Sequence, residues 1–262
     1  MKDLDKVLQS ASTTSNEEEL KFLAHHPSSK VISKLILNNN LTEDLALIVA
    51  SRKNISPEIL ESLSKDIRWM ESYRIMLALC KNPKTPQKIS LSLIKSLRIF
   101  DMADLTRNQH VPINVRIKAE ANINDKILSM PLGIKITLAK MASSNVLMKL
   151  IQDGMKEVVI TCLDSPYLTE GDICKIISMK KISSLVIRLI ANHPKWACRY
   201  HVQWALILNN HTPLSSVVNF LKNIKTTDLK ELYAAPEVPS STKPFIYREL
   251  SDRDQAQSGF TH

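Results

Sequence analysis

The pattern of apolar and polar positions repeats along the chain and predicts helices throughout. Between polar turns, apolar residues recur at three- and four-residue spacing, as in Ile59, Leu60 and Leu63 or in Val217, Val218 and Leu221. This spacing places the apolar side chains on one face of an α-helix. No segment shows the sustained alternation and hairpin turns that are typical of strands. The pattern therefore predicts an all-α protein built from short helices and short loops.

Hydroxyl residues, often followed by proline, mark the predicted helix starts. Ser56-Pro57, Thr85-Pro86 and Thr212-Pro213 each place a hydroxyl where it can accept a hydrogen bond from an unpaired backbone N–H. The proline then occupies the first helical position, where a missing N–H costs nothing. Thr42 and Thr169, each followed by a glutamate, predict two more capped helices.

The unit of turn and helix recurs in steps of 26 to 29 residues. Four copies are "HHPSSKVISKL" (25–35), "RKNISPEILESL" (52–63), "KNPKTPQKISLSL" (81–93) and "RNQHVPINVRI" (107–117). A period of this length is typical of solenoids, in which each repeat buries its apolar face only against its neighbours.

A longer repeat contains the shorter one. When the sequence is compared with itself at a shift of 127, "LTE" at 41–43 falls on "LTE" at 168–170. At the same shift Trp69 falls on Trp196 and Tyr73 on Tyr200, without a gap. These matches predict a duplicated module. The predicted organisation is an N-terminal cap (1–19), a first helical-repeat module (20–120), a connecting repeat (121–146), a second module (147–250) and a polar, disordered tail (251–262).

The units "KNISPEIL", "NPKTPQKI" and "NQHVPINVRIKA" resemble bacterial α-solenoid repeats of the HEAT-like and leucine-rich-repeat-variant kind. The resemblance covers about residues 20–250 and implies a right-handed superhelix of HEAT-like helical pairs. Some leucine-rich-repeat-variant proteins carry an iron–sulfur cluster on cysteines that precede the repeats. Because no cysteine precedes Cys80 here, we expect no cofactor. HEAT-like folds also include DNA glycosylases that act on alkylated bases.

Composition and charge narrow the function only slightly. Only 4 of the 262 residues are glycine, which favours helices over Gly-dependent turns and sheets. The net charge of +9 favours an acidic partner, such as nucleic acid or an acidic protein. The alternative is that the excess charge comes from lysines scattered over the surface, which only keep the protein soluble. The four cysteines are isolated in the sequence, as in proteins of a reducing compartment. The sequence also lacks an apolar run long enough for a membrane span and a hydrophobic signal segment. We therefore expect a cytoplasmic protein without a membrane segment.

Two helices that share aromatic and basic residues are the candidate binding surface for a protein partner. The residues concerned are Trp69, Tyr73, Arg74, Trp196, Arg199, Tyr200 and Trp204. Tryptophan, tyrosine and arginine are common anchors of interfaces. The alternative is that the rings fill the seam between consecutive helix layers.

A second candidate surface is basic and suits nucleic acid. It comprises Arg107, Arg116 and Lys118 near the end of the first module, and Lys175, Lys180 and Lys181 in the second. If one face of the stack gathered these residues, phosphate contacts with salt-dependent affinity would follow. The sequence does not assign them to one face.

Catalytic and metal sites have little support in the sequence. Nucleophile-elbow, zinc-protease and phosphate-loop motifs are missing, and His193, Cys198 and His201 lack the spacing of a zinc site. Asp66 and Glu71 near Trp69 are the carboxylates that a glycosylase-like site would use. We therefore expect a non-catalytic scaffold for a protein partner, with a nucleic-acid-binding or base-repair solenoid as the alternative and a structural spacer as a third.

Overall fold

The structure of the protein is a computed structural model that describes residues 2–258. It contains 19 α-helices and two short 3₁₀ helices, and no strand occurs within this range. The all-α prediction is confirmed. None of the helices in the described range combines the length and the apolar character needed to cross a bilayer. The chain divides into two compact units, residues 1–125 and 126–262.

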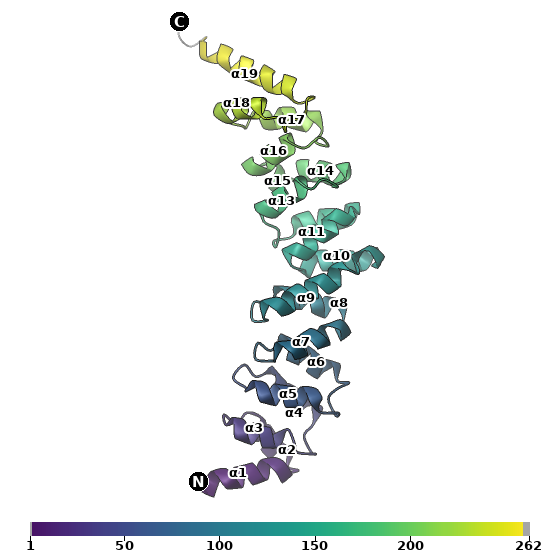
Figure 1. Cartoon of the computed structure of the whole chain (residues 1–262), viewed down its shortest axis with the longest axis vertical. Helices are drawn as coiled ribbons and strands as arrows, with labels where there is room; N and C mark the ends of the chain where they lie inside the picture. Colours follow the sequence, from purple (N-terminus) through teal and green to yellow (C-terminus); the bar gives the residue numbers. More distant parts are fainter. Residues whose placement is uncertain (1, 259–262) are drawn as a thin grey trace. The chain divides into compact units, whose positions relative to one another are not determined.

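In unit 1, successive helices stack in chain order in two layers (Figure 1). The first layer contains α2 (Glu17–Ala24), α4 (Glu43–Ser51), α6 (Tyr73–Lys81) and α8 (Ile99–Arg107). The second layer contains α1 (Lys2–Thr13), α3 (Ser29–Leu35), α5 (Pro57–Lys65), α7 (Gln87–Leu93) with the 3₁₀ helix η1 (Ile94–Ser96), and α9 (Ile113–Asn124). Helices of one layer pack on the next helix of that layer, as α4 does on α6, and on their chain neighbours in the other layer.

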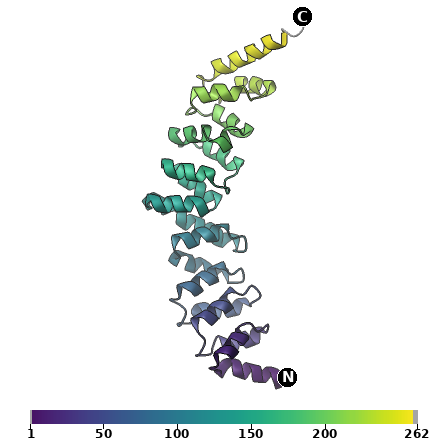
Figure 2. The ribbon, with the colours of Figure 1, turned by 180° about the vertical axis from the view of Figure 1, so that it is seen from behind.

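Unit 2 follows the same plan, and the view from behind shows its helices in the same order (Figure 2). The first layer contains α11 (Ser144–Asp153), α13 (Glu170–Ile177), α16 (Tyr200–Ile207) and α18 (Thr226–Ala234). The second contains α10 (Leu132–Met141), α12 (Lys156–Asp164), α14 (Ser184–Ala191), α17 (Leu214–Leu221) and α19 (Lys243–Ser258). The 3₁₀ helix η2 (Ile127–Ser129) precedes α10, and the short α15 (Pro194–Ala197) precedes α16.

The apolar spacing predicted from the sequence forms the core of both units. On α5 the buried residues are Ile59, Leu60 and Leu63. The equivalent residues of α14 at a shift of 127, Val186, Ile187 and Ile190, are buried as well. The boundary between the units falls inside the segment 121–146 that was expected to connect them.

Of the five predicted helix caps, two are present in the structure and three differ from the prediction. Thr42 accepts a hydrogen bond from the N–H of Leu45, and Thr169 forms a capping box with Asp172. Ser56 is the N-cap residue of α5 and Pro57 begins the helix, as predicted, but the Ser56 side chain makes no cap bond. Pro86 and Pro213 are themselves the N-cap residues of α7 and α17. The buried hydroxyl of Thr212 instead donates to the carbonyl of Leu206, so it closes the preceding helix rather than opening the next.

Buried asparagines join consecutive repeats. The side-chain amide of Asn82 donates to the carbonyls of Ala50 and Arg52, at 2.7 and 2.9 Å, and its oxygen accepts from the N–H of Lys84. Asn209, at a shift of 127, donates to the carbonyl of Ile177. Each amide satisfies carbonyls at the C-terminal end of an earlier helix, which would otherwise lack a partner.

Residues 251–258 of the segment expected to be a disordered tail form the end of α19, and residues 259–262 lie outside the described residues. Ile246 anchors the start of α19 in the core. Further along, the guanidinium of Arg253 donates to the carbonyls of Leu221 and Ile224, at 2.9 and 2.7 Å. A polar segment is thus held by hydrogen bonds to the preceding repeat.

Candidate partner-binding grooves

Two of the three tryptophans in the predicted binding surface are buried. Trp69 is 9% exposed and Trp196 is 2% exposed, so a partner cannot reach either ring while the helices stay packed. The structure thus corrects the expectation that they face a partner, in favour of the alternative in which they fill the seam between layers. Trp204 differs, because it is half-buried and lines a cavity described below.

The turns around the buried tryptophans use cations to bind the preceding repeat. The guanidinium of Arg68 lies 5.1 Å from the centroid of the Trp69 ring and donates to the carbonyls of Ile36 and Asn38. Lys195 takes the equivalent place in unit 2: its Nζ lies 4.3 Å from the centroid of Trp196 and donates to the carbonyl of Ser165. The ring N–H of Trp196 also donates to the carbonyl of Leu163. These contacts join each tryptophan-bearing turn to the preceding repeat and so stabilise the fold.

Both predicted tyrosines bind the start of the next first-layer helix. The hydroxyl of Tyr73 donates to Asp101 in the first turn of α8 and accepts from the N–H of Arg98. The hydroxyl of Tyr200 binds Asp228 and the N–H of Lys225 in the same way. Burial and the bond to Asp101 raise the pKa of Tyr73, and the bond from Tyr200 lowers the pKa of Asp228.

The predicted arginines of this surface are exposed and face acids of the preceding repeat. Arg74 lies 2.7 Å from Asp44, and Arg199 lies 3.9 Å from Glu170. Both side chains are 54% exposed, so these ion pairs contribute little to stability.

The six predicted basic residues divide between the two units. Arg107 on α8 and Lys118 on α9 are exposed and Arg116 is half-buried, all three in unit 1. Lys175, Lys180 and Lys181 are exposed on and after α13 in unit 2. Lys175 and Lys180 line the same cavity as Trp204, so the structure brings together members of both predicted surfaces.

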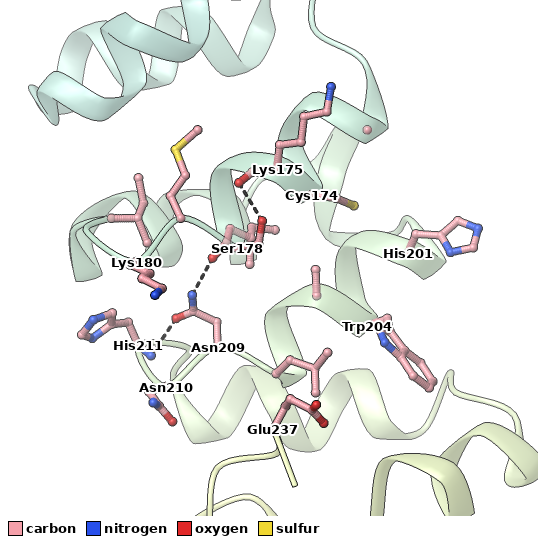
Figure 3. A pocket seen from close by; sticks show the side chains of 16 residues that line it. Cys174, Lys175, Ser178, Lys180, His201, Trp204, Asn209, Asn210, His211 and Glu237 are labelled. Carbon is pink, nitrogen blue, oxygen red and sulfur yellow. Dashed lines mark hydrogen bonds between the residues drawn. The ribbon is translucent and has the colours of Figure 1, made fainter. Parts of the chain in front are cut away.

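Each unit has one groove between two adjacent first-layer helices and the turns beyond them. The N-groove lies between α4 and α6 and has a volume of about 560 Å³. The C-groove lies between α13 and α16 and has a volume of about 780 Å³. Figure 3 shows Lys180, Asn209 and His211 on one side of the C-groove and Trp204 and His201 on the other.

The two grooves are built from equivalent residues. The N-groove is lined by 11 residues. For all of them except Asn108, the residue 127 positions later in the chain lines the C-groove. Four of these pairs keep the same side chain: Ser51 and Ser178, Lys53 and Lys180, Ala78 and Ala205, Asn82 and Asn209. The grooves are therefore a property of the repeated architecture rather than of one loop.

The six remaining pairs differ in size or charge: Leu47 and Cys174, Arg74 and His201, Leu77 and Trp204, Lys81 and Leu208, Pro83 and Asn210, His110 and Glu237. In the N-groove both Arg74 and Lys81 form ion pairs, Lys81 with Asp104 at 2.7 Å. In the C-groove, Leu208 replaces the paired lysine and Cys174 is smaller than Leu47. The C-groove is the larger of the two, with about 780 Å³ against about 560 Å³.

Of the two carboxylates proposed for base-repair chemistry, Glu71 is exposed and Asp66 is engaged elsewhere. Asp66 accepts a hydrogen bond from Arg68 at 2.6 Å, and this bond lowers the pKa of Asp66. Its neighbour Trp69 is buried, so the two do not form an open pocket for a base. His193 caps α15 by accepting from the N–H of Lys195, and its other ring nitrogen lies 3.1 Å from Asp164. Within residues 2–258, no three His, Cys, Asp or Glu side chains cluster as metal ligands would.

We expect the four cysteines to differ in reactivity toward iodoacetamide. Burial raises the pKa of the Cys80 and Cys162 thiols to about 12, so neither forms the reactive thiolate at about pH 8. Cys198 is exposed and Cys174 partly so. Mass spectrometry should therefore find Cys198 alkylated first and Cys174 next, with Cys80 and Cys162 unmodified until denaturant is added. Early labelling of either buried thiol in the folded protein contradicts this packing.

Several groove residues did not stand out in the sequence. Cys174 on α13, Leu208 and Asn209 after α16, and Glu237 after α18 belong to three successive repeats, and only the packing of these repeats brings them together. One signal was present, because Asn82 and Asn209 match at the shift of 127.

The fold and the grooves define the class of protein: all-α, with each helix packed on its neighbours, as expected of a helical-repeat protein. No model of a known protein family matches the chain, and no curated protein or solved structure matches it.

Proposed function

We propose that this protein is a non-catalytic scaffold that binds segments of a partner protein in its two grooves. The observation that supports this most is the equivalence of the N-groove and the C-groove, residue by residue, at the shift of 127. Grooves between helices with an apolar floor and a few polar groups are common binding sites. A scaffold needs such a concave surface and no reacting group.

The proposal extends to the architecture. The chain is a right-handed α-solenoid of HEAT-like helical pairs that arose by duplication of a module of 127 residues. The support is the repetition of contacts as well as of residues: Tyr73 with Asp101 and Tyr200 with Asp228 make the same bond. Asn82 and Asn209 likewise make equivalent bonds to Ala50 and Ile177.

A protein partner suits the C-groove better than nucleic acid does. Its floor contains Ile182, Ala205 and Leu208, which offer apolar contacts to side chains. Arginine, the usual residue for bidentate phosphate contacts, does not line it. Of the arginines and lysines that line the N-groove, Arg74 and Lys81 are already paired with acids.

A peptide-display selection on the full chain tests this proposal, with Cys174 as the reporter of the C-groove. Selected peptides should slow alkylation of Cys174 by about tenfold and leave Cys198 unaffected, because an occupied groove excludes the reagent. The variant Leu47→Cys provides the matched reporter in the N-groove.

Two outcomes would overturn the proposal. One is that no peptide is enriched, or that enriched peptides protect neither reporter. The other is that single- or double-stranded oligonucleotides bind at about 50 mM salt, are released at about 200 mM, and protect the groove thiols. That result would support the nucleic-acid alternative instead.

A further inference from the structure

The C-groove continues into a second hollow of the same unit. This hollow has a volume of about 310 Å³ and lies between η2, α11 and the turn after α13. Met179 lines both the hollow and the C-groove, so the two adjoin at this side chain. Together they form one surface that runs across the repeats of unit 2, here called the lysine face.

The lysine face carries four exposed lysines whose charge is not neutralised. Lys149 and Lys181 line the hollow, and Lys175 and Lys180 line the C-groove. Within residues 2–258 none of the four forms an ion pair. The hollow also contains Asp153, but that carboxylate binds the buried Lys135 at 2.7 Å and is 10% exposed. The C-groove is also lined by one exposed acid, Glu237, so the four lysines leave the face with an excess of positive charge for an acidic ligand.

An apolar site lies at one end of this row of charges. Trp204 is half-buried and lines the C-groove together with Cys174 and Leu208. The N-groove has leucine, Leu47 and Leu77, at the positions of Cys174 and Trp204, and its volume is smaller by about 220 Å³. Only the C-groove combines the small side chain of Cys174 with a tryptophan in its lining. The groove therefore offers an aromatic contact to a bulky apolar or aromatic side chain of a ligand.

We infer that the lysine face binds an extended acidic segment of a partner protein that carries one bulky apolar side chain. The apolar side chain lies against Trp204 in the C-groove, and the carboxylates that flank it pass over Met179 toward Lys180, Lys181 and Lys149. This inference rests on the proposed function and names the class of partner for one of its two grooves. Apolar burial supplies the anchor, and the row of lysines selects acidic segments and speeds their association.

Anisotropy titrations with a labelled synthetic peptide test the inference on the full chain. The probe contains glutamate and serine with one central phenylalanine. Matched peptides replace glutamate by glutamine, or phenylalanine by alanine. We expect the acidic probe to bind at least about tenfold more tightly than either matched peptide, because each loses one of the two contacts.

Variants locate the site. Lys180→Gln/Lys181→Gln should weaken binding of the probe about tenfold or more, through the lost opposite charges. Trp204→Ala should weaken it about tenfold through the lost anchor. Lys156→Gln/Lys222→Gln is the matched control, because it removes the same charge from the second layer of unit 2 and should change affinity less than about twofold. Circular dichroism confirms that each variant is folded.

The outcomes separate this inference from the proposed function. If peptides from the display selection protect Cys174 but the acidic probe does not bind, the inference is wrong and the scaffold stands. The inference also fails if the glutamine peptide binds equally well, or if the lysine variants bind like the control. An oligonucleotide that binds more tightly than the probe and loses affinity in Lys180→Gln/Lys181→Gln overturns it in favour of nucleic acid.

Discussion

The substitution Asp153→Ala is expected to lower the free energy of unfolding by about 3–5 kcal/mol, because it leaves a buried ammonium group without its partner. The Nζ atom of Lys135 lies 2.7 Å from Asp153 Oδ2, and the two side chains are only 4% and 10% exposed. Lys135 Nζ also donates to the weakly accepting sulfur of Met155, at 3.6 Å. Urea denaturation followed by circular dichroism measures the loss.

The double substitution Lys135→Met/Asp153→Leu separates the cost of the unpaired charge from any need for the pair itself. We expect the double variant to recover most of the stability, since apolar residues of similar volume often replace a buried pair without loss. Unit 1 offers a precedent: Leu8 stands at the position equivalent to Lys135 at the shift of 127. Glu157→Ala, an exposed acid of the same unit, serves as the control. A single variant as stable as this control would contradict the prediction.

Replacement of Asn82 by leucine is expected to cost about 3 kcal/mol, because it removes hydrogen bonds that buried backbone groups cannot replace with water. Asn82 is 4% exposed, and its amide holds two carbonyls of the preceding repeat. The carbonyl of Ala50 and the N–H of Lys84 would lose their side-chain partners.

Asn39→Leu is the control for this second prediction, because Asn39 lies in an exposed turn of the same unit. Its effect should stay within about 0.5 kcal/mol, as for most surface substitutions. Thermal and urea denaturation of both variants give the comparison. Equal stability of the two variants would mean that water or a shifted backbone satisfies the freed carbonyls.

Elements set by local sequence were predictable. Ile59, Leu60 and Leu63 are buried on α5 as their spacing indicated, and the all-α class follows from many such segments. Positions that repeat at the shift of 127 also make equivalent contacts, as Tyr73 and Tyr200 do. In these cases the physical cause lies within one helix or between adjacent helices, so periodicity reveals it.

Features that depend on packing between repeats were harder to predict. Spacing placed Trp69 and Trp196 on a helical face without showing that this face is buried. The C-groove combines Cys174, Trp204 and Glu237 from separate repeats, and no local pattern marks them as neighbours. The polar end of α19 lacks apolar periodicity, because the hydrogen bonds of Arg253 rather than apolar burial hold it.

The hydrogen bonds between repeats also bear on how the protein forms during translation. They join residues that lie 24 to 33 positions apart, as in Asn38 with Thr14 and Trp196 with Leu163. Closing such short loops costs little chain entropy, and proteins rich in local contacts fold quickly. Asn38, Asn82 and Tyr73 all find their partners within residues 1–125. A nascent chain can therefore complete these contacts of unit 1 while the ribosome is still synthesising unit 2.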